Sequence, residues 1–209
     1  MDRENSFGQY EEPNAVDRFG IALSRARIRR SVGKFAGKRI ADIGCGFHAL
    51  VVRGLLDDVD AATLIDVAIS DELKAHPRVV AIEGELPGVL ERIPDASLDV
   101  VVCNNVLEHL WEPSVAVRHF RRVLRPNGVA LLNVPSWRGK FFLEFASFRL
   151  NVVPRVEVDD HKHYYSPHEL WTLLVQGGFR PSEIKSCHTH KFGLNTYAEC
   201  RVGTDADPR

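Results

Sequence analysis

One stretch of the sequence constrains the fold more than any other, and it runs from Arg39 to Ala49 (RIADIGCGFHA). Its first residues form an apolar run interrupted by one acid, Asp42, which is typical of a short buried strand. Gly44 and Gly46 then permit a tight turn and let a ligand approach the main chain, because glycine has no Cβ. The turn is expected to open into a helix from Ala49 to about Leu56, whose free N–H groups would face that ligand.

A second apolar run covers residues 61–65 and ends in an acid, Asp66. This carboxylate follows Gly44 by about 20 residues, the spacing at which acids accept hydrogen bonds from ribose hydroxyls. The first half of the chain is therefore expected to hold a cofactor that contains a nucleoside.

The residues of the turn help to distinguish between cofactors. Residues 44–49 fit the dinucleotide pattern G-x-G-x-x-A, which favours an NAD(P)-dependent oxidoreductase. Asp42 argues against it, because a fixed negative charge at the mouth of the turn disfavours a pyrophosphate and suits a cationic ligand. Residues 42–46 (DIGCG) resemble motif I of class I S-adenosylmethionine-dependent methyltransferases. The third glycine of that motif is His48 here, so a side chain would narrow the methionine end of the pocket.

The order of strands and helices predicts an α/β fold, a doubly wound and mostly parallel sheet. The resemblance implies a Rossmann-like sheet of seven strands that ends in an antiparallel hairpin. The expected strands are residues 39–43, 62–67, 79–82, 98–103 and 129–134, with the hairpin at 179–186 and 196–202.

Two further segments carry the same resemblance. Residues 104–110 (NNVLEHL) resemble the family's N-x-V-L-E-H-L stretch after the fourth strand, and residues 124–128 (LRPNG) are similar to its L-K-P-G-G turn. Both argue against the oxidoreductase. Ligands of such sheets bind beyond the carboxyl ends of the strands, and the resemblance adds an acid after the third strand, Glu85 in preference to Glu83. The expected S-adenosylmethionine-binding residues are Asp42, Gly44, Cys45, Gly46, Asp66, Val67, Glu85, Leu86 and Asn104.

Methyl transfer needs alignment of donor and acceptor, and a base if the acceptor is a hydroxyl. Candidate catalytic residues are His161 and His163, which precede a helix expected to begin at Ser166, and His109. Some ubiquinone-type O-methyltransferases, which this chain resembles, carry an E-x-x-E-H metal motif after the fourth strand. The first acid of that motif is Asn105 here, so no metal site is predicted.

The expected organisation is an N-terminal segment with a covering helix (1–36), a methyltransferase domain (37–203) with an acceptor-side lid at about 137–165, and a tail (204–209). Arg25, Arg27, Arg29 and Arg30 make the covering helix basic; a solvated face is favoured over a site for an acidic partner.

The sequence predicts methyl transfer to a small-molecule acceptor, most simply at oxygen. An alternative is a non-catalytic protein that binds the cofactor. A net charge of −1 argues against nucleic acid as a partner. No stretch is apolar enough to span a membrane, no signal peptide is recognisable, and the cysteines are scattered, which together favour a cytoplasmic protein, as monomer or homodimer.

Overall fold

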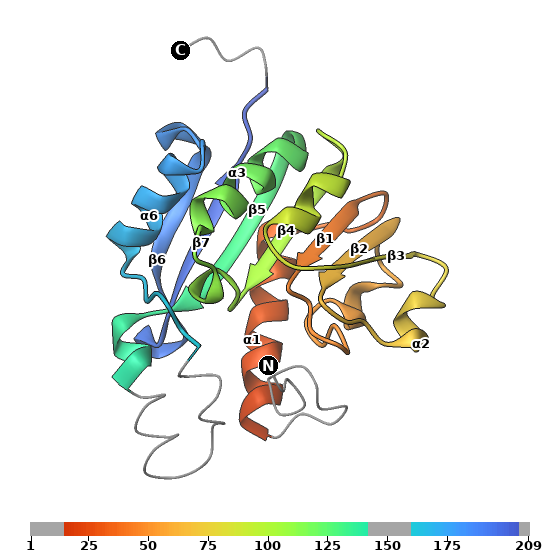
Figure 1. The fold of residues 1–209 in the computed structure, drawn as a ribbon, viewed down its shortest axis with the longest axis horizontal. Helices are drawn as coiled ribbons and strands as arrows, with labels where there is room; N and C mark the ends of the chain where they lie inside the picture. The colour runs from red at the N-terminus through yellow and green to blue at the C-terminus, as the bar shows by residue number, and fades with distance from the viewer. Residues whose placement is uncertain (1–14, 142–159, 205–209) are drawn as a thin grey trace.

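The computed structural model describes residues 15–141 and 160–204, and it contains one sheet of seven strands (Figure 1). The strands are β1 (Arg39–Ile43), β2 (Ala61–Asp66), β3 (Val79–Glu83), β4 (Leu98–Asn104), β5 (Leu124–Pro135), β6 (Ile184–His190) and β7 (Asn195–Arg201). Their order is β3-β2-β1-β4-β5-β7-β6, with β7 antiparallel to both neighbours and the other pairs parallel. The predicted fold class is confirmed, and the strand order reverses between β1 and β4.

The central strands separate two apolar cores. Alternate residues of β4 point to opposite faces, so Val101 and Cys103 belong to one core and Val100 and Val102 to the other. Helices α3 (Pro113–Val123) and α6 (Pro167–Gln176) cover the first face, as Figure 1 shows, and α1 (Ala15–Val32) contributes to the core of the second. Burial on both faces explains why β1 and β4 have nearly continuous apolar sequences.

The helix predicted from Ala49 to Leu56 is wrong. The chain forms turns there and one short 3-10 helix, η1 (Arg53–Leu55). Ala49 takes a left-handed conformation with φ 44°, which a helix does not allow. Arg25 of α1 donates to the carbonyl oxygens of Leu50 and Val51, at 2.6 and 3.1 Å. Those are the carbonyls that a helix would use itself, so a tertiary contact replaces local hydrogen bonding.

Several boundaries also differ from the prediction. Residues 124–128 belong to β5 rather than to a turn before it, with Asn127 at φ 65° and an irregular register opposite β4. The hairpin begins later, because the 3-10 helix η4 (Pro181–Glu183) precedes β6. The remaining short elements are α2 (Asp71–Lys74), η2 (Gly88–Arg92), η3 (Leu107–His109) and η5 (Lys191–Gly193).

Most of the expected lid, residues 142–159, lies outside the described residues, while residues 137–141 are helical. The expected N-cap Asn14 also lies outside them. Among the helices in 15–141 and 160–204, none combines the length and apolarity that crossing a bilayer requires.

A capping box begins α6, as the sequence predicts, and its contribution to stability can be measured. Ser166 Oγ accepts the N–H of Glu169 at 3.3 Å, and the Glu169 carboxylate accepts the N–H of Ser166 at 2.7 Å. We expect Ser166→Ala to lower the free energy of unfolding in urea by about 1 kcal/mol. Ser182→Ala, at an exposed serine, is the control and should change it by about 0.5 kcal/mol or less. Equal losses in the two variants would contradict the assignment.

Candidate active site

The main chain reverses directly after β1, in a turn whose glycines take left-handed conformations. φ is 68° at Gly44 and 74° at Gly46. The N–H groups of Gly44 and Cys45 both donate to the carbonyl oxygen of Ile65, at 2.8 and 3.1 Å. A Cβ built on Gly44 would lie 2.3 Å from Cγ2 of Val106, so a side chain does not fit there. The turn is therefore packed between β2 and the segment after β4.

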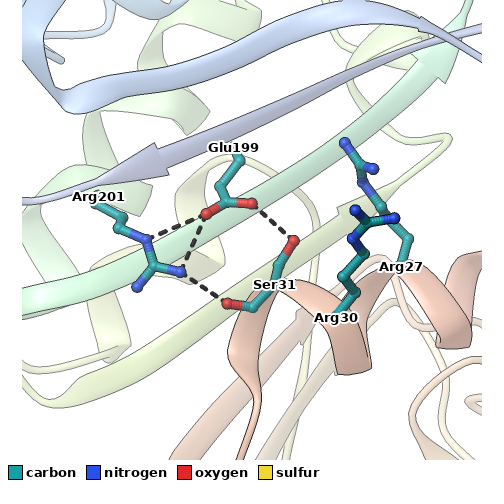
Figure 2. Close-up of a pocket in the computed structure, with 5 residues that line it drawn as sticks. All are labelled: Arg27, Arg30, Ser31, Glu199 and Arg201. Carbon is teal, nitrogen blue, oxygen red and sulfur yellow. Dashed lines mark hydrogen bonds and ion pairs between the residues drawn. The ribbon is translucent and has the colours of Figure 1, made fainter.

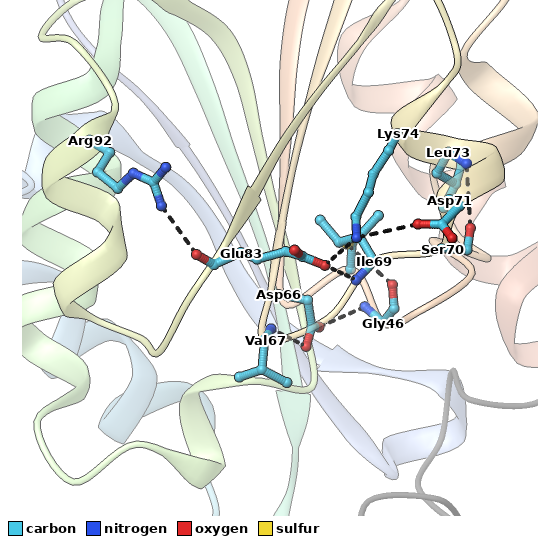
Figure 3. A network of polar contacts seen from close by, with 11 residues as sticks. Gly46, Asp66, Val67, Ile69, Ser70, Asp71, Leu73, Lys74, Glu83 and Arg92 are labelled. Atoms are coloured by element: carbon cyan, nitrogen blue, oxygen red, sulfur yellow. Dashed lines mark hydrogen bonds and ion pairs between the residues drawn. The ribbon is translucent and has the colours of Figure 1, made fainter.

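Asp66 ends β2 with both carboxylate oxygens oriented by main-chain donors (Figure 3). Oδ2 accepts the N–H of Gly46 at 2.8 Å, and Oδ1 accepts the N–H of Val67 at 2.7 Å. Each carboxylate oxygen can accept a second hydrogen bond. The geometry therefore allows the two oxygens to receive neighbouring hydroxyl groups of a ribose beside the glycine turn.

The two acids after β3 have different surroundings. Glu83 accepts the N–H of Ile69 at 2.8 Å and pairs with Lys74, with 2.8 Å between Nζ and Oε1 (Figure 3). The hydrogen bond from Lys74 is the main reason that the pKa of Glu83 is lowered. Glu85 is exposed, and its carboxylate forms no hydrogen bond or ion pair within the described residues. Glu85 is thus the acid that remains available to a ligand.

Asp42 is the buried acid of the turn. Its side chain is almost fully enclosed, and Oδ2 has no hydrogen-bond partner among the described residues. Burial, helped by the charge of Asp66, raises the pKa of Asp42 to about 8. A buried carboxyl without a partner is costly to ionise unless a cation lies beside it. The site therefore fits a ligand that brings a positive charge.

The other expected cofactor residues line the same edge of the sheet. Cys45 is buried, and burial raises the pKa of its thiol, so the sulfur stays protonated. Leu86 packs against the first core, and Val67 keeps 36% of its surface exposed. Asn104 ends β4, and its Nδ2 is buried without a partner in the described residues. Apolar surface and unpaired polar atoms thus adjoin the glycine turn.

A second group of polar residues lies after β4. Glu108 is fully buried, and neither carboxylate oxygen has a hydrogen-bond partner in the part of the chain that is described. Burial raises the pKa of Glu108 to about 8. Nδ1 of His109 lies 3.1 Å from Oδ2 of Asp160. Burial lowers the pKa of His109, while the charge of Asp160 opposes the shift. At neutral pH the imidazole is therefore neutral and oriented by a carboxylate.

The segment that carries the other two candidate histidines is tied to this group. The N–H groups of Lys162 and His163 donate to the carbonyl oxygen of Glu108, at 2.7 and 3.2 Å. The ring of His161 lies 4.8 Å from that of His109, centroid to centroid. The structure thus brings His109 and His161 together at the carboxyl end of β4. His163 lies in the same segment, and its Nε2 is buried without a partner in the described residues.

His161 has its own hydrogen-bond partner. Its Nδ1 lies 3.1 Å from the hydroxyl of Tyr164. Burial, followed by the nearby His109, lowers the pKa of His161 to about 4. Asp160 and Tyr164 were not among the site residues predicted from the sequence. The signal that could have found them is the polar run from Asp159 to Tyr165, which mixes acids, histidines and tyrosines.

The same residues are the candidate metal ligands. One ligand atom each from Glu108, His109 and His161 lies within 4.8 Å of the others. Two imidazoles with one carboxylate suit a transition metal better than Mg²⁺. Asn105 does not complete the set, because its Oδ1 accepts from Asn133 and Asn195, at 3.2 and 3.3 Å.

Known proteins resemble this chain in sequence. Residues 41–132 match the methyltransferase domain family. The ubiquinone biosynthesis O-methyltransferase of Bordetella avium is 26% identical over 172 residues, which cover 76% of this chain and 68% of that protein. A Mycobacterium tuberculosis protein, named "Probable S-adenosylmethionine-dependent methyltransferase", is 28% identical over 166 residues, 78% of this chain and 57% of its own length.

A solved structure shows the same fold. The S-adenosylmethionine-dependent methyltransferase from Mesorhizobium loti superimposes with a TM-score of 0.61 at 14% identity, covering 84% of this chain and 96% of its own. At this identity the likeness concerns the fold alone. Residues 41–132 therefore resemble a methyltransferase domain, the relatives include S-adenosylmethionine-dependent methyltransferases, and S-adenosylmethionine is the cofactor of this chain.

Proposed function

We propose that the protein transfers the methyl group of S-adenosylmethionine to a hydroxyl oxygen of a small molecule. The observation that carries the proposal is the pair formed by His109 and Asp160, with 3.1 Å between Nδ1 and Oδ2. The name of the Bordetella avium relative, an O-methyltransferase, supports an oxygen acceptor. Incubating the protein with a panel of phenols and hydroxy acids and measuring S-adenosylhomocysteine tests the proposal, and methylation of amines or thiols alone would contradict it.

The cofactor supplies an electrophilic methyl group on a positively charged sulfur. A hydroxyl acceptor would lose its proton as its oxygen bonds to the methyl carbon and the bond from that carbon to sulfur breaks, which leaves S-adenosylhomocysteine. Nε2 of His109 would receive that proton. Asp160 holds Nδ1 of His109, orients the ring and stabilises the imidazolium that forms. The proton then leaves to solvent, which restores the neutral base.

The other candidate histidines have different roles in this proposal. The pKa of His161 is about 4, so its neutral ring is a weak base, and we assign it to positioning the acceptor together with Tyr164. His163 holds the segment in place through its main-chain hydrogen bond to Glu108. The expected lid at 137–165 would cover the acceptor, which exposed aromatic side chains at Trp137 and Phe141 support.

Asp42 should make binding of the cofactor depend on pH. Its carboxyl is protonated below about pH 8 in the free protein, and pairing with the ligand's ammonium group requires the ionised form. Affinity for S-adenosylhomocysteine should therefore rise by at most about tenfold for each unit of pH and level off above about pH 8. Asp42→Asn should bind more weakly and with a flat profile in calorimetry. Asp60→Asn, at an exposed acid, should keep the wild-type profile; a flat wild-type profile would refute the role of Asp42.

His109 should control turnover without affecting the cofactor. His109→Ala should lower turnover by about 10²–10⁴-fold and bind S-adenosylhomocysteine normally. As the pH is lowered, the wild-type rate should fall only at pH values below the ordinary pKa of histidine, because burial lowers the pKa of His109. Asp160→Asn should move this fall in rate to lower pH and slow turnover. His119→Gln, at a histidine of α3, should change neither turnover nor its dependence on pH. Equal effects of the His109 and His119 variants would exclude His109 as the base.

Transfer should not require a metal ion. Asn105 replaces the carboxylate of the metal motif, and its amide is already bound by Asn133 and Asn195. Turnover should be unchanged after incubation with EDTA. Loss of turnover that Mg²⁺, Mn²⁺ or Zn²⁺ restores would show instead that Glu108, His109 and His161 form a metal centre.

A further inference from the structure

A pocket of about 310 Å³ lies between α1 and β7, and every residue that lines it is polar or charged. Its lining residues are Arg27, Arg30, Ser31, Glu199 and Arg201 (Figure 2). The first three belong to α1 and the other two to β7. Three guanidinium groups thus surround a single carboxylate, which leaves an excess of positive charge. Pockets of this volume hold small molecules, so a small anion suits this one.

The carboxylate of the pocket is already engaged by the protein. One oxygen of Glu199 accepts from Oγ of Ser31 at 2.7 Å, and the other accepts from Nε of Arg201 at 3.1 Å, as Figure 2 shows. The hydroxyl oxygen of Tyr197 lies 3.0 Å from the same Oγ of Ser31. Glu199 therefore compensates the charge of Arg201 and leaves those of Arg27 and Arg30 uncompensated.

Neither of these two arginines pairs with an acid among the described residues. Arg27 stacks on the ring of Tyr197, with 4.3 Å between Cζ and the centroid, and its Nη2 lies 3.0 Å from Nε2 of His188. His188 supplies no negative charge, and burial, followed by the charge of Arg27, lowers its pKa. Arg30 is exposed and forms no hydrogen bond or ion pair within residues 15–141 and 160–204. Two positive charges therefore remain for a ligand.

Arg201 is held in one orientation by the protein and keeps one free nitrogen. Its Nε donates to Glu199, and its Nη2 donates to the carbonyl oxygen of Ser31 at 2.7 Å. Its Nη1 has no hydrogen-bond partner in the part of the chain that the structure describes. A guanidinium that is already ordered loses little further freedom when it binds a ligand. The planar guanidinium group also matches the geometry of phosphate oxygens.

The Arg201 end of the pocket lies far from the cofactor. Arg201 is opposite Val129 of β5, whereas Pro135 ends β5 at the edge that carries the glycine turn. The stretch of β5 from Val129 to Pro135 is about 20 Å long, at about 3.3 Å per residue. A ligand that contacts Arg201 is therefore a different molecule from the cofactor.

We propose that this pocket binds a phosphate dianion, carried by a small phosphomonoester or free in solution. A phosphate monoester has nearly two negative charges at neutral pH, which match the two uncompensated charges of Arg27 and Arg30. Its terminal oxygens accept hydrogen bonds from these two side chains and from Nη1 of Arg201. A ligand held in this way bridges α1 and β7. The site is separate from that of methyl transfer and does not depend on the acceptor.

Calorimetry on protein saturated with S-adenosylhomocysteine tests this site, because the cofactor pocket is then filled. The probe is ribose 5-phosphate, ribose is the uncharged control, and dimethyl phosphate is the control with a single negative charge. We expect ribose 5-phosphate to bind at least about tenfold more tightly than dimethyl phosphate, and ribose not to bind. Equal binding of the three compounds, or no binding of any phosphate, overturns the inference.

A variant of an exposed arginine locates the site. Arg30→Met should weaken binding of ribose 5-phosphate by about 10- to 100-fold, because it removes a hydrogen bond between two charged groups. Arg18→Met is the matched control, since it removes the same charge from an exposed residue of α1 that does not line the pocket. It should bind ribose 5-phosphate as the wild type does. Equal losses in the two variants would reveal only general attraction to a basic helix and would overturn the inference.

The β7 side of the pocket is tested separately. Arg201→Met should weaken binding of ribose 5-phosphate by a similar factor, and a thermal melt reports whether the variant folds. If it does not, Arg201→Lys, which keeps the charge and loses the planar group, replaces it and should also bind more weakly. Unchanged affinity in the variants of Arg30 and Arg201 places the phosphate elsewhere and refutes the site.

Inorganic phosphate distinguishes the two sources of the ligand. Tighter binding of ribose 5-phosphate than of inorganic phosphate, with both weakened by Arg30→Met, assigns the pocket to a phosphomonoester. Equal affinities, again with both weakened by Arg30→Met, assign it to free phosphate.

Discussion

The contact between Gly44 and Val106 is the constraint on which the rest of the site depends. A Cβ at Gly44 would lie 2.3 Å from Cγ2 of Val106, so the turn after β1 and the segment after β4 pack at main-chain distance. Asp42 precedes this contact on one side, and Glu108 and His109 follow it on the other. One close approach therefore sets the carboxyl of Asp42 and the imidazole of His109 relative to each other, at the ends of adjacent parallel strands.

Both sides of this contact carry a carboxyl group that burial keeps protonated at neutral pH. The pKa is about 8 for Asp42 and for Glu108. Both values exceed those of the unfolded chain, so the folded protein binds more protons between about pH 4 and 8. The free energy of unfolding therefore falls as pH rises through this window, and a cation that pairs with either carboxylate opposes the loss. The site thus gains affinity for cationic ligands at the expense of ligand-free stability.

Local patterns predicted the first four strands to within one residue, because strands buried on both faces appear as apolar runs. Asp66, at the end of β2, was predicted in the same way, because it directly follows an apolar run. The prediction of a helix after the glycine turn was wrong because Arg25, in a distant helix, donates hydrogen bonds to the carbonyl groups of Leu50 and Val51. The pairing of His109 with Asp160 joins residues 51 positions apart, and no local pattern encodes it.

The basic stretch of α1 shows how tertiary contacts change the interpretation of a charge pattern. A solvated face was the favoured explanation, and it holds for Arg29 and Arg30, which are exposed. Arg25 instead donates to the loop after β1, and Arg27 lines a cavity. A helix after β1 would satisfy its own carbonyl groups and present N–H donors to the ligand. Here α1 satisfies two of those carbonyls through Arg25 and brings donors to the sheet edge through Arg27. Side chains of the N-terminal helix therefore take part in holding the loop after β1.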